Sequence, residues 1–119
     1  MRLYHGSDVE SVRCLIGGEE LDSTIARARH MDGLLGFYLA TDEGDAEYFA
    51  LRRSPGAIIA VEIDDEIVES LIKGGAVMRP IPTSPMSPTF AGDELFIPIE
   101  CFPAFNEARN HGRIGMHVV

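Results

Sequence analysis

The chain has 119 residues, 45% of them hydrophobic, and a formal net charge of −9 at pH 7. That length and composition suit one globular domain over residues 1–119 with a core of its own. The acidic balance disfavours nucleic acid as a general partner, because binders of the phosphate backbone carry a basic surface. No apolar run reaches the roughly 18 residues of a membrane span, and residues 1–6 lack the apolar stretch of a signal peptide. We therefore expect a cytoplasmic protein with no membrane partner.

The first quarter of the chain predicts two extended segments and a helix. Residues 2–5 alternate polar and apolar side chains, which is a strand pattern, and the turn-forming residues 6–8 end it. Residues 11–16 predict a second extended segment that stops at two glycines. In residues 20–30 the apolar side chains recur at helical spacing, which predicts a helix.

The middle of the chain carries the clearest signals. Residues 36–40 are aromatic and apolar, and they predict a strand. Thr41 is a suitable N-cap and acidic residues follow it, so we expect a helix from there to residues 52–53. Residues 57–63 form an apolar, β-branched run that is typical of a central buried strand.

The remainder of the chain is divided by a long loop. A helix is expected over residues 65–73 and a strand over 76–81. Residues 80–92 are rich in proline, serine and threonine and predict an irregular loop, of a length that is usually functional or mobile. After the loop the pattern predicts a strand, a short helix and a last strand, at 93–99, 103–110 and 114–118.

These elements mix strands and short helices without a regular β-α alternation, which favours an α+β fold over a doubly wound sheet. Cys14 and Cys101 lie in apolar surroundings and form no metal-binding pair, so we expect them to pack as small hydrophobic residues. The histidines are scattered along the chain, and the sequence predicts no metal site. It also lacks the glycine-rich phosphate loops and the hydrolase nucleophile motif.

Three polar residues at strand positions remain as candidates for chemistry. His5 ends the first expected strand, Tyr38 lies in a strand that leads into a helix, and Glu94 opens the strand after the long loop. Taken singly, each has a structural explanation, because such histidines and tyrosines usually pack and such glutamates are usually solvated. Their order and spacing together agree with one family.

Three segments carry the resemblance: Leu3-Tyr4-His5-Gly6-Ser7, Gly36-Phe37-Tyr38-Leu39-Ala40 and Asp93-Glu94-Leu95-Phe96-Ile97. They resemble the three motifs of the ADP-ribosyltransferase superfamily of the His-Tyr-Glu type, which includes poly(ADP-ribose) polymerases, diphtheria-like toxins and small bacterial relatives. The segments span most of the chain. The resemblance implies two small, mainly antiparallel sheets around an NAD cleft, with short flanking helices.

The resemblance also implies roles for the motif residues. His5 would bind the ribose hydroxyl on the nicotinamide side, and the segment of Gly6 and Ser7 would hold the cofactor, with the Gly6 backbone on the nicotinamide amide. Tyr38 would stack on the nicotinamide ring. Glu94 would bond the ribose 2′-hydroxyl and stabilise the cationic sugar as the glycosidic bond breaks, which is the role of a carboxylate in glycosidases.

The helix after the second motif differs from the polymerase pattern. Where that branch has a serine early in the helix, this chain has Gly44 and Asp45. The same helix offers two candidates for a second stacking ring, Tyr48 and Phe49.

The region of the third motif is less distinctive. Residues 80–92 stand where the family places its substrate-recognition loop, and they give no indication of the acceptor. The absence of Glu-x-Glu disfavours modification of arginine. Glu100 is a rival to Glu94 at the far end of the same expected strand.

We therefore predict an NAD-dependent mono-ADP-ribosyltransferase, or an NAD glycohydrolase with water as acceptor. NAD is the substrate, and a protein is favoured over nucleic acid as acceptor. The small size suggests a toxin-like catalytic domain, for which a neutralising partner protein is expected. The alternative is a degenerate domain that binds NAD, ADP-ribose or a protein without turnover. An RNA 2′-phosphotransferase-like enzyme is disfavoured, because the acidic chain lacks a set of phosphate-binding arginines and histidines.

Overall fold

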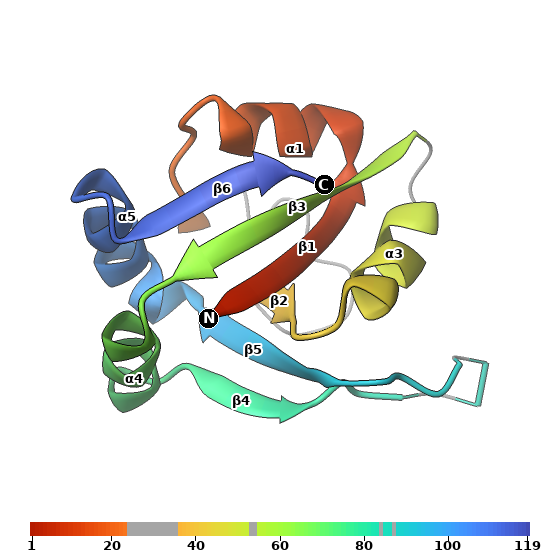
Figure 1. The fold of residues 1–119 in the computed structure, drawn as a ribbon. Coiled ribbons are helices and arrows are strands. Elements are labelled where there is room, and N and C mark those ends of the chain that lie inside the picture. The colour runs from red at the N-terminus through yellow and green to blue at the C-terminus, as the bar shows by residue number, and fades with distance from the viewer. Residues whose placement is uncertain (24–35, 53–54, 84, 87) are drawn as a thin grey trace.

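The computed structural model describes residues 1–23, 36–52, 55–83, 85–86 and 88–119. Its centre is one six-stranded sheet in the order β4-β5-β2-β1-β3-β6, antiparallel throughout (Figure 1). The strands are β1 Arg2–Asp8, β2 Gly36–Ala40, β3 Gly56–Ile63, β4 Val77–Pro80, β5 Asp93–Pro98 and β6 Ile114–Val118. The described helices are α1 Val9–Ile16, α3 Glu43–Leu51, α4 Asp65–Lys73 and α5 Phe102–Asn110, with a 3-10 turn at Ile99–Cys101. This arrangement confirms the α+β class.

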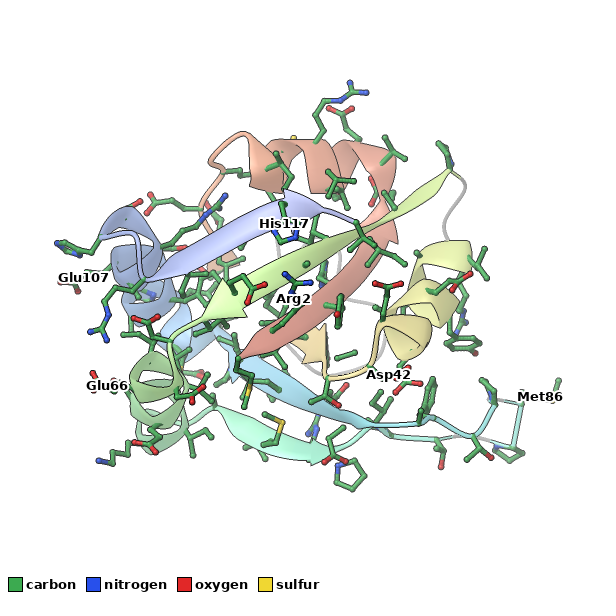
Figure 2. The ribbon with its side chains drawn as sticks, viewed as in Figure 1. Arg2, Asp42, Glu66, Met86, Glu107 and His117 are labelled. Carbon is green, nitrogen blue, oxygen red and sulfur yellow. The ribbon has the colours of Figure 1, made fainter. Side chains whose placement is uncertain are left out.

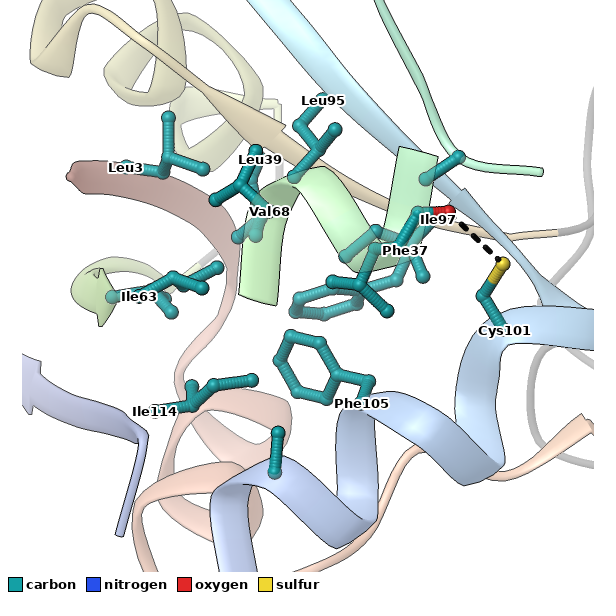
Figure 3. Close-up of a cluster of buried hydrophobic side chains, with 14 of the residues drawn as sticks. Leu3, Phe37, Leu39, Ile63, Val68, Leu95, Ile97, Cys101, Phe105 and Ile114 are labelled. Atoms are coloured by element: carbon teal, nitrogen blue, oxygen red, sulfur yellow. Dashed lines mark hydrogen bonds between the residues drawn. The ribbon is translucent and has the colours of Figure 1, made fainter. Parts of the chain in front are cut away.

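Helices cover both faces of the sheet, and the two-residue period of the strands decides which side chains meet them. The larger core lies under α1, α4 and α5, and it includes the fully buried Leu3, Leu39, Leu95 and Ile97 (Figure 3). Phe105 of α5 fills its centre. A smaller cluster lies on the opposite face under α3: Ala40, Ala46 and Ile81, with Tyr4, Phe49, Ile58 and Phe90 packed against them.

Most of the predicted elements are confirmed. The apolar run of residues 57–63 lies in β3, which is flanked by strands on both sides, as its composition indicates. The expected helix over 65–73 is α4, and the two strands on either side of the long loop are β4 and β5. Both cysteines are free, and Cys101 is buried in the larger core. None of the helices in the described part of the chain is long and apolar enough to cross a membrane.

The expectation of two small sheets is wrong, because all six strands belong to one sheet. The sheet is nonetheless weakly joined at its middle. β1 shares one registered pair with β2, Tyr4 opposite Ala40, whereas it follows β3 along its whole length from Arg2 to Asp8. We call the place where β1 and β2 part, residues 5–8 beside residues 36–39, the seam.

Two local predictions near the N-terminus are wrong. Residues 11–16 are helical, because Asp8 caps α1 by accepting from the Ser11 amide at 3.0 Å, and Val12 and Leu15 are buried on one side of the helix. Residues 6–8 continue β1 instead of ending it. Both predictions rest on the strand and turn propensities of single residues, which tertiary packing overrides.

The cap predicted at Thr41 lies one residue later. Asp42 lies at the start of α3 (Figure 2). It is the N-cap of this helix and accepts from the Asp45 amide at 3.2 Å. Thr41 is engaged elsewhere, since its Oγ1 accepts from the Asp93 amide at 3.0 Å and its own amide donates to the Asp93 carbonyl oxygen. The helix expected over residues 20–30 falls largely on positions outside the described residues.

Candidate functional site

The first two motifs lie on either side of the seam. His5, Gly6 and Ser7 are on β1, and Gly36 to Tyr38 are on β2, where the two strands share no registered pair beyond Tyr4 and Ala40. The third motif is on β5, the neighbour of β2 on the side away from β1. β5 pairs with β2 along the whole length of β2. The sheet therefore brings the three motifs onto three consecutive strands.

Tyr38 and Glu94 share one face of the sheet. Tyr38 is registered opposite Phe96, and Ala40 is registered opposite Glu94. Because opposite residues on paired strands project to the same side, both side chains are on the face that α3 covers. The rings of Tyr38 and Phe96 are in contact, with their centroids 5.2 Å apart.

His5 turns its ring to the other face. It is in phase with the buried Leu3, it pairs with Ile59 of the larger core, and its imidazole stacks on Phe37 with ring centroids 4.3 Å apart. Its Nδ1 lies 2.8 Å from the carbonyl oxygen of Tyr38, so the ring bridges the seam to β2. The structure therefore joins His5 to Tyr38 through the backbone, while the imidazole ring lies on the opposite side of the sheet from the Tyr38 ring.

The charge state of His5 follows from its surroundings. Burial lowers the pKa of His5 below its ordinary value, although the bond to the Tyr38 carbonyl acts in the opposite direction. A neutral imidazole whose Nδ1–H donates to that carbonyl has Nε2 as an acceptor. Such a ring can accept a hydrogen bond from a hydroxyl group.

Glu94 is a buried carboxylate, with 3% of its surface exposed. A glutamate at the start of a strand is usually exposed to solvent, so this burial is unusual. Arg79 of β4 is registered directly opposite, and its Nε donates to Glu94 Oε2 at 2.9 Å. Burial raises the pKa of Glu94, and the Arg79 guanidinium offsets part of that rise.

A second carboxylate holds the chain that enters β5. Asp45 of α3 is 5% exposed, and its two oxygens accept from the amides of Ala91 and Gly92 at 2.9 and 2.8 Å. Together with the bonds between Thr41 and Asp93, this clamp ties the end of the long loop to the start of α3. The Arg79 ion pair and the Asp45 clamp together fix where Glu94 lies along the sheet.

Neither Arg79 nor Asp45 was identified as a site residue from the sequence. The sequence contained a signal for Arg79. Two expected strands flank the long loop, and the oppositely charged Arg79 and Glu94 lie close to its two ends. Asp45 was noted as a departure from the family's serine. Its burial depends on the loop folding back onto α3, which no local pattern indicates.

Gly6 has a structural reason for being glycine. A Cβ at this position would lie 2.0 Å from the Ala46 carbonyl oxygen, because the backbone of α3 approaches β1 there. Ser7 donates through its Oγ to Asp8 Oδ1 at 3.2 Å. The predicted cofactor contacts of these two residues stay predictions.

Tyr48 and Phe49, the two candidates for a second stacking ring, point in different directions from α3. Phe49 packs against the cluster on the α3 face, which also contains Ala40. Tyr48 meets Phe49 and Phe90 edge-on, and Arg52 lies over its ring. Phe49 is therefore the ring of this pair that faces the sheet.

Other features lie outside the three motifs. Glu100 is exposed in the 3-10 turn after β5. An open hollow of about 440 Å³ lies between the end of α3 and the start of β3, and Leu51, Ile58 and Val119 are among its lining residues. Within the described ranges, no three His, Cys, Asp or Glu side chains are grouped so that they would hold a metal ion.

A comparison of the chain with protein-family models, with characterised proteins and with solved structures found no match in any of the three. The function proposed for the chain therefore rests on its own residues and their geometry.

Proposed function

We propose that the chain is an NAD-dependent mono-ADP-ribosyltransferase or NAD glycohydrolase. The observation that carries the proposal is that the three motifs lie on three consecutive strands of the sheet. Two of them face each other where the sheet is weakly joined, and the third places a buried carboxylate on the same face as Tyr38. Tyr38 and Glu94 would contact NAD on the α3 face, whereas the His5 ring lies on the opposite face against Phe37.

The proposed chemistry assigns one task to each side chain. Cleavage of the bond between nicotinamide and ribose develops positive charge on the sugar, which the Glu94 carboxylate stabilises. Tyr38, with Phe49 as the second ring, holds the nicotinamide that leaves. The His5 ring lies on the opposite face, so in this scheme it acts only through its bond to the Tyr38 carbonyl oxygen. A protein side chain or water then takes the ADP-ribose, and a toxin-like role with a neutralising partner is part of the same hypothesis.

A second candidate function is a domain that binds NAD or ADP-ribose without turnover. The ion pair between Arg79 and Glu94 favours it, because a carboxylate that is already bonded and buried is less available to a substrate. The two candidates differ in whether nicotinamide is released.

The deciding experiment measures nicotinamide release from NAD by the wild type and by Glu94→Gln. Loss of the carboxylate should reduce release by at least about 100-fold, the usual effect of removing one electrostatic catalytic group. The glutamine oxygen can still accept from Arg79, so the variant is expected to remain folded. Glu100→Gln is the matched control on the same segment, and it should release nicotinamide at the wild-type rate.

Each outcome separates the candidates. Release that depends on Glu94 but not on Glu100 supports the enzyme. NAD binding by the wild type, measured by calorimetry, without any release favours the binding domain. If the wild type neither binds nor cleaves NAD, both candidates are rejected.

A further inference from the structure

A continuous set of contacts joins Glu94 to Tyr38 through two residues to which the three motifs assign no task. Arg79 Nε bonds Glu94 Oε2 at 2.9 Å, and the same guanidinium lies over the Phe96 ring, with its central carbon 4.7 Å from the ring centroid. Phe96 in turn contacts the Tyr38 ring at 5.2 Å. β4, β5 and β2 each contribute to this set, and all four side chains are on the α3 face of the sheet.

We propose that Arg79 is a positioning residue for the reaction: it orients the Glu94 carboxylate and, through Phe96, supports the ring of Tyr38. The proposal rests on the proposed function, in which these two residues act on NAD. Arg79 itself touches no substrate in this scheme. Its effect is exerted through the two groups that do.

The geometry explains why an arginine is suited to this position. Its planar guanidinium can stack flat on an aromatic ring while its edge donates to a carboxylate, whereas a lysine ammonium has no planar group to stack. Among the described residues Arg79 bonds Oε2 alone, which leaves Oε1 of Glu94 for a ribose hydroxyl. A carboxylate anchored by one oxygen keeps its orientation while the other oxygen acts.

The hydrogen bonding of Arg79 is incomplete. Its Nη2 is buried and has no hydrogen-bond partner in the described part of the chain. An unpartnered buried donor costs free energy, so this arrangement is not the one that stability alone would select. A role in holding Glu94 accounts for its presence.

Arg79 also affects the ionisation of Glu94. Burial raises the pKa of that carboxyl and Arg79 lowers it, so removal of the cation leaves only the first effect. Other titratable side chains that the described structure places on this face are Tyr4 on β1, Tyr38 on β2 and Asp45 on α3. None of them is a cation that would replace Arg79.

The test compares nicotinamide release across pH for the wild type, Arg79→Met and Arg79→Lys. Without the cation, kcat should fall about 10- to 100-fold, as expected when a catalytic group is misplaced. KM should change much less, and the acidic limb of the kcat profile should move to higher pH. Lysine should return that limb towards the wild-type position without restoring full kcat. Arg113→Met, which removes an exposed arginine paired with Asp64 and Glu66, is the matched control.

The outcomes are distinguishable. A wild type that releases no nicotinamide overturns the proposed function and the positioning role with it. If the wild type releases nicotinamide and Arg79→Met has the same kcat and the same acidic limb of the pH profile, the positioning role alone is overturned. It is also overturned if the acidic limb of Arg79→Lys stays at the pH found for Arg79→Met. Titration of the Glu94 carboxyl by ¹³C NMR measures the rise in its pKa without turnover. Arg79→Lys provides a second variant if Arg79→Met does not fold.

Discussion

Replacement of Asp45 tests whether α3 holds the long loop in place. The Asp45 carboxylate is buried and accepts from two consecutive backbone amides, those of Ala91 and Gly92. Asp45→Ala removes both acceptors at once. Asp45→Asn keeps the size of the side chain and one oxygen, but its NH₂ group then faces an amide that also donates.

The expected magnitude follows from these two bonds. Each hydrogen bond to a charged group contributes about 1.5–3 kcal/mol. Ala91 is exposed and Gly92 is half-buried, so water replaces part of what is lost. We expect Asp45→Ala to lower the free energy of unfolding by about 2–4 kcal/mol and Tm by roughly 10 °C. Asp45→Asn should lose about half as much, because one amide keeps an acceptor.

The assay is urea denaturation, together with hydrogen exchange at the two amides. Glu47→Ala, an exposed position on the same helix, is the control and should change stability by less than about 0.5 kcal/mol. In Asp45→Ala the amides of Ala91 and Gly92 should exchange faster than in the wild type. An Asp45→Ala variant with wild-type stability and wild-type protection at both amides would refute the reasoning.

Two further predictions concern β1. Because the pKa of His5 is lower in the folded state, the unfolded chain binds more protons below about pH 6.5, and stability falls as the pH drops through that range. His5→Gln should flatten the pH dependence of the unfolding free energy between about pH 7 and pH 5, and equal slopes would contradict the assignment. Gly6→Ala places a Cβ 2.0 Å from the Ala46 carbonyl oxygen and should cost about 3 kcal/mol in urea denaturation. Gly115→Ala, whose Cβ meets nothing within 4 Å, should be close to neutral.

The elements that could be predicted from the sequence are those whose own residues contain the signal. β3 is an uninterrupted apolar, β-branched run, and α4 has acidic residues at its start, buried Val68 and Leu71 on one side, and Gly74 at its end. Such patterns act over a few residues and do not depend on distant parts of the chain. The α+β class and the long loop between β4 and β5 follow from the same kind of signal.

Where local preference and packing disagreed, the sequence was misleading. The β-branched residues of α1 favour an extended chain, but Val12 and Leu15 are three residues apart and both are buried against the sheet. The Asp8 cap, which was interpreted as part of a turn, starts the helix instead. Thr41 has the chemistry of a cap, yet its hydroxyl is used by the Asp93 amide.

The sequence by itself determined which polar residues stand on strands: His5, Tyr38 and Glu94. Only the tertiary structure decided where they point, because a strand alternates its faces and the register with its neighbours selects which residues meet. That register put Tyr38 and Glu94 on one face and the His5 ring on the other, and it placed Arg79 opposite Glu94. Strand pairing joins residues that are far apart in the chain, so no local pattern contains it.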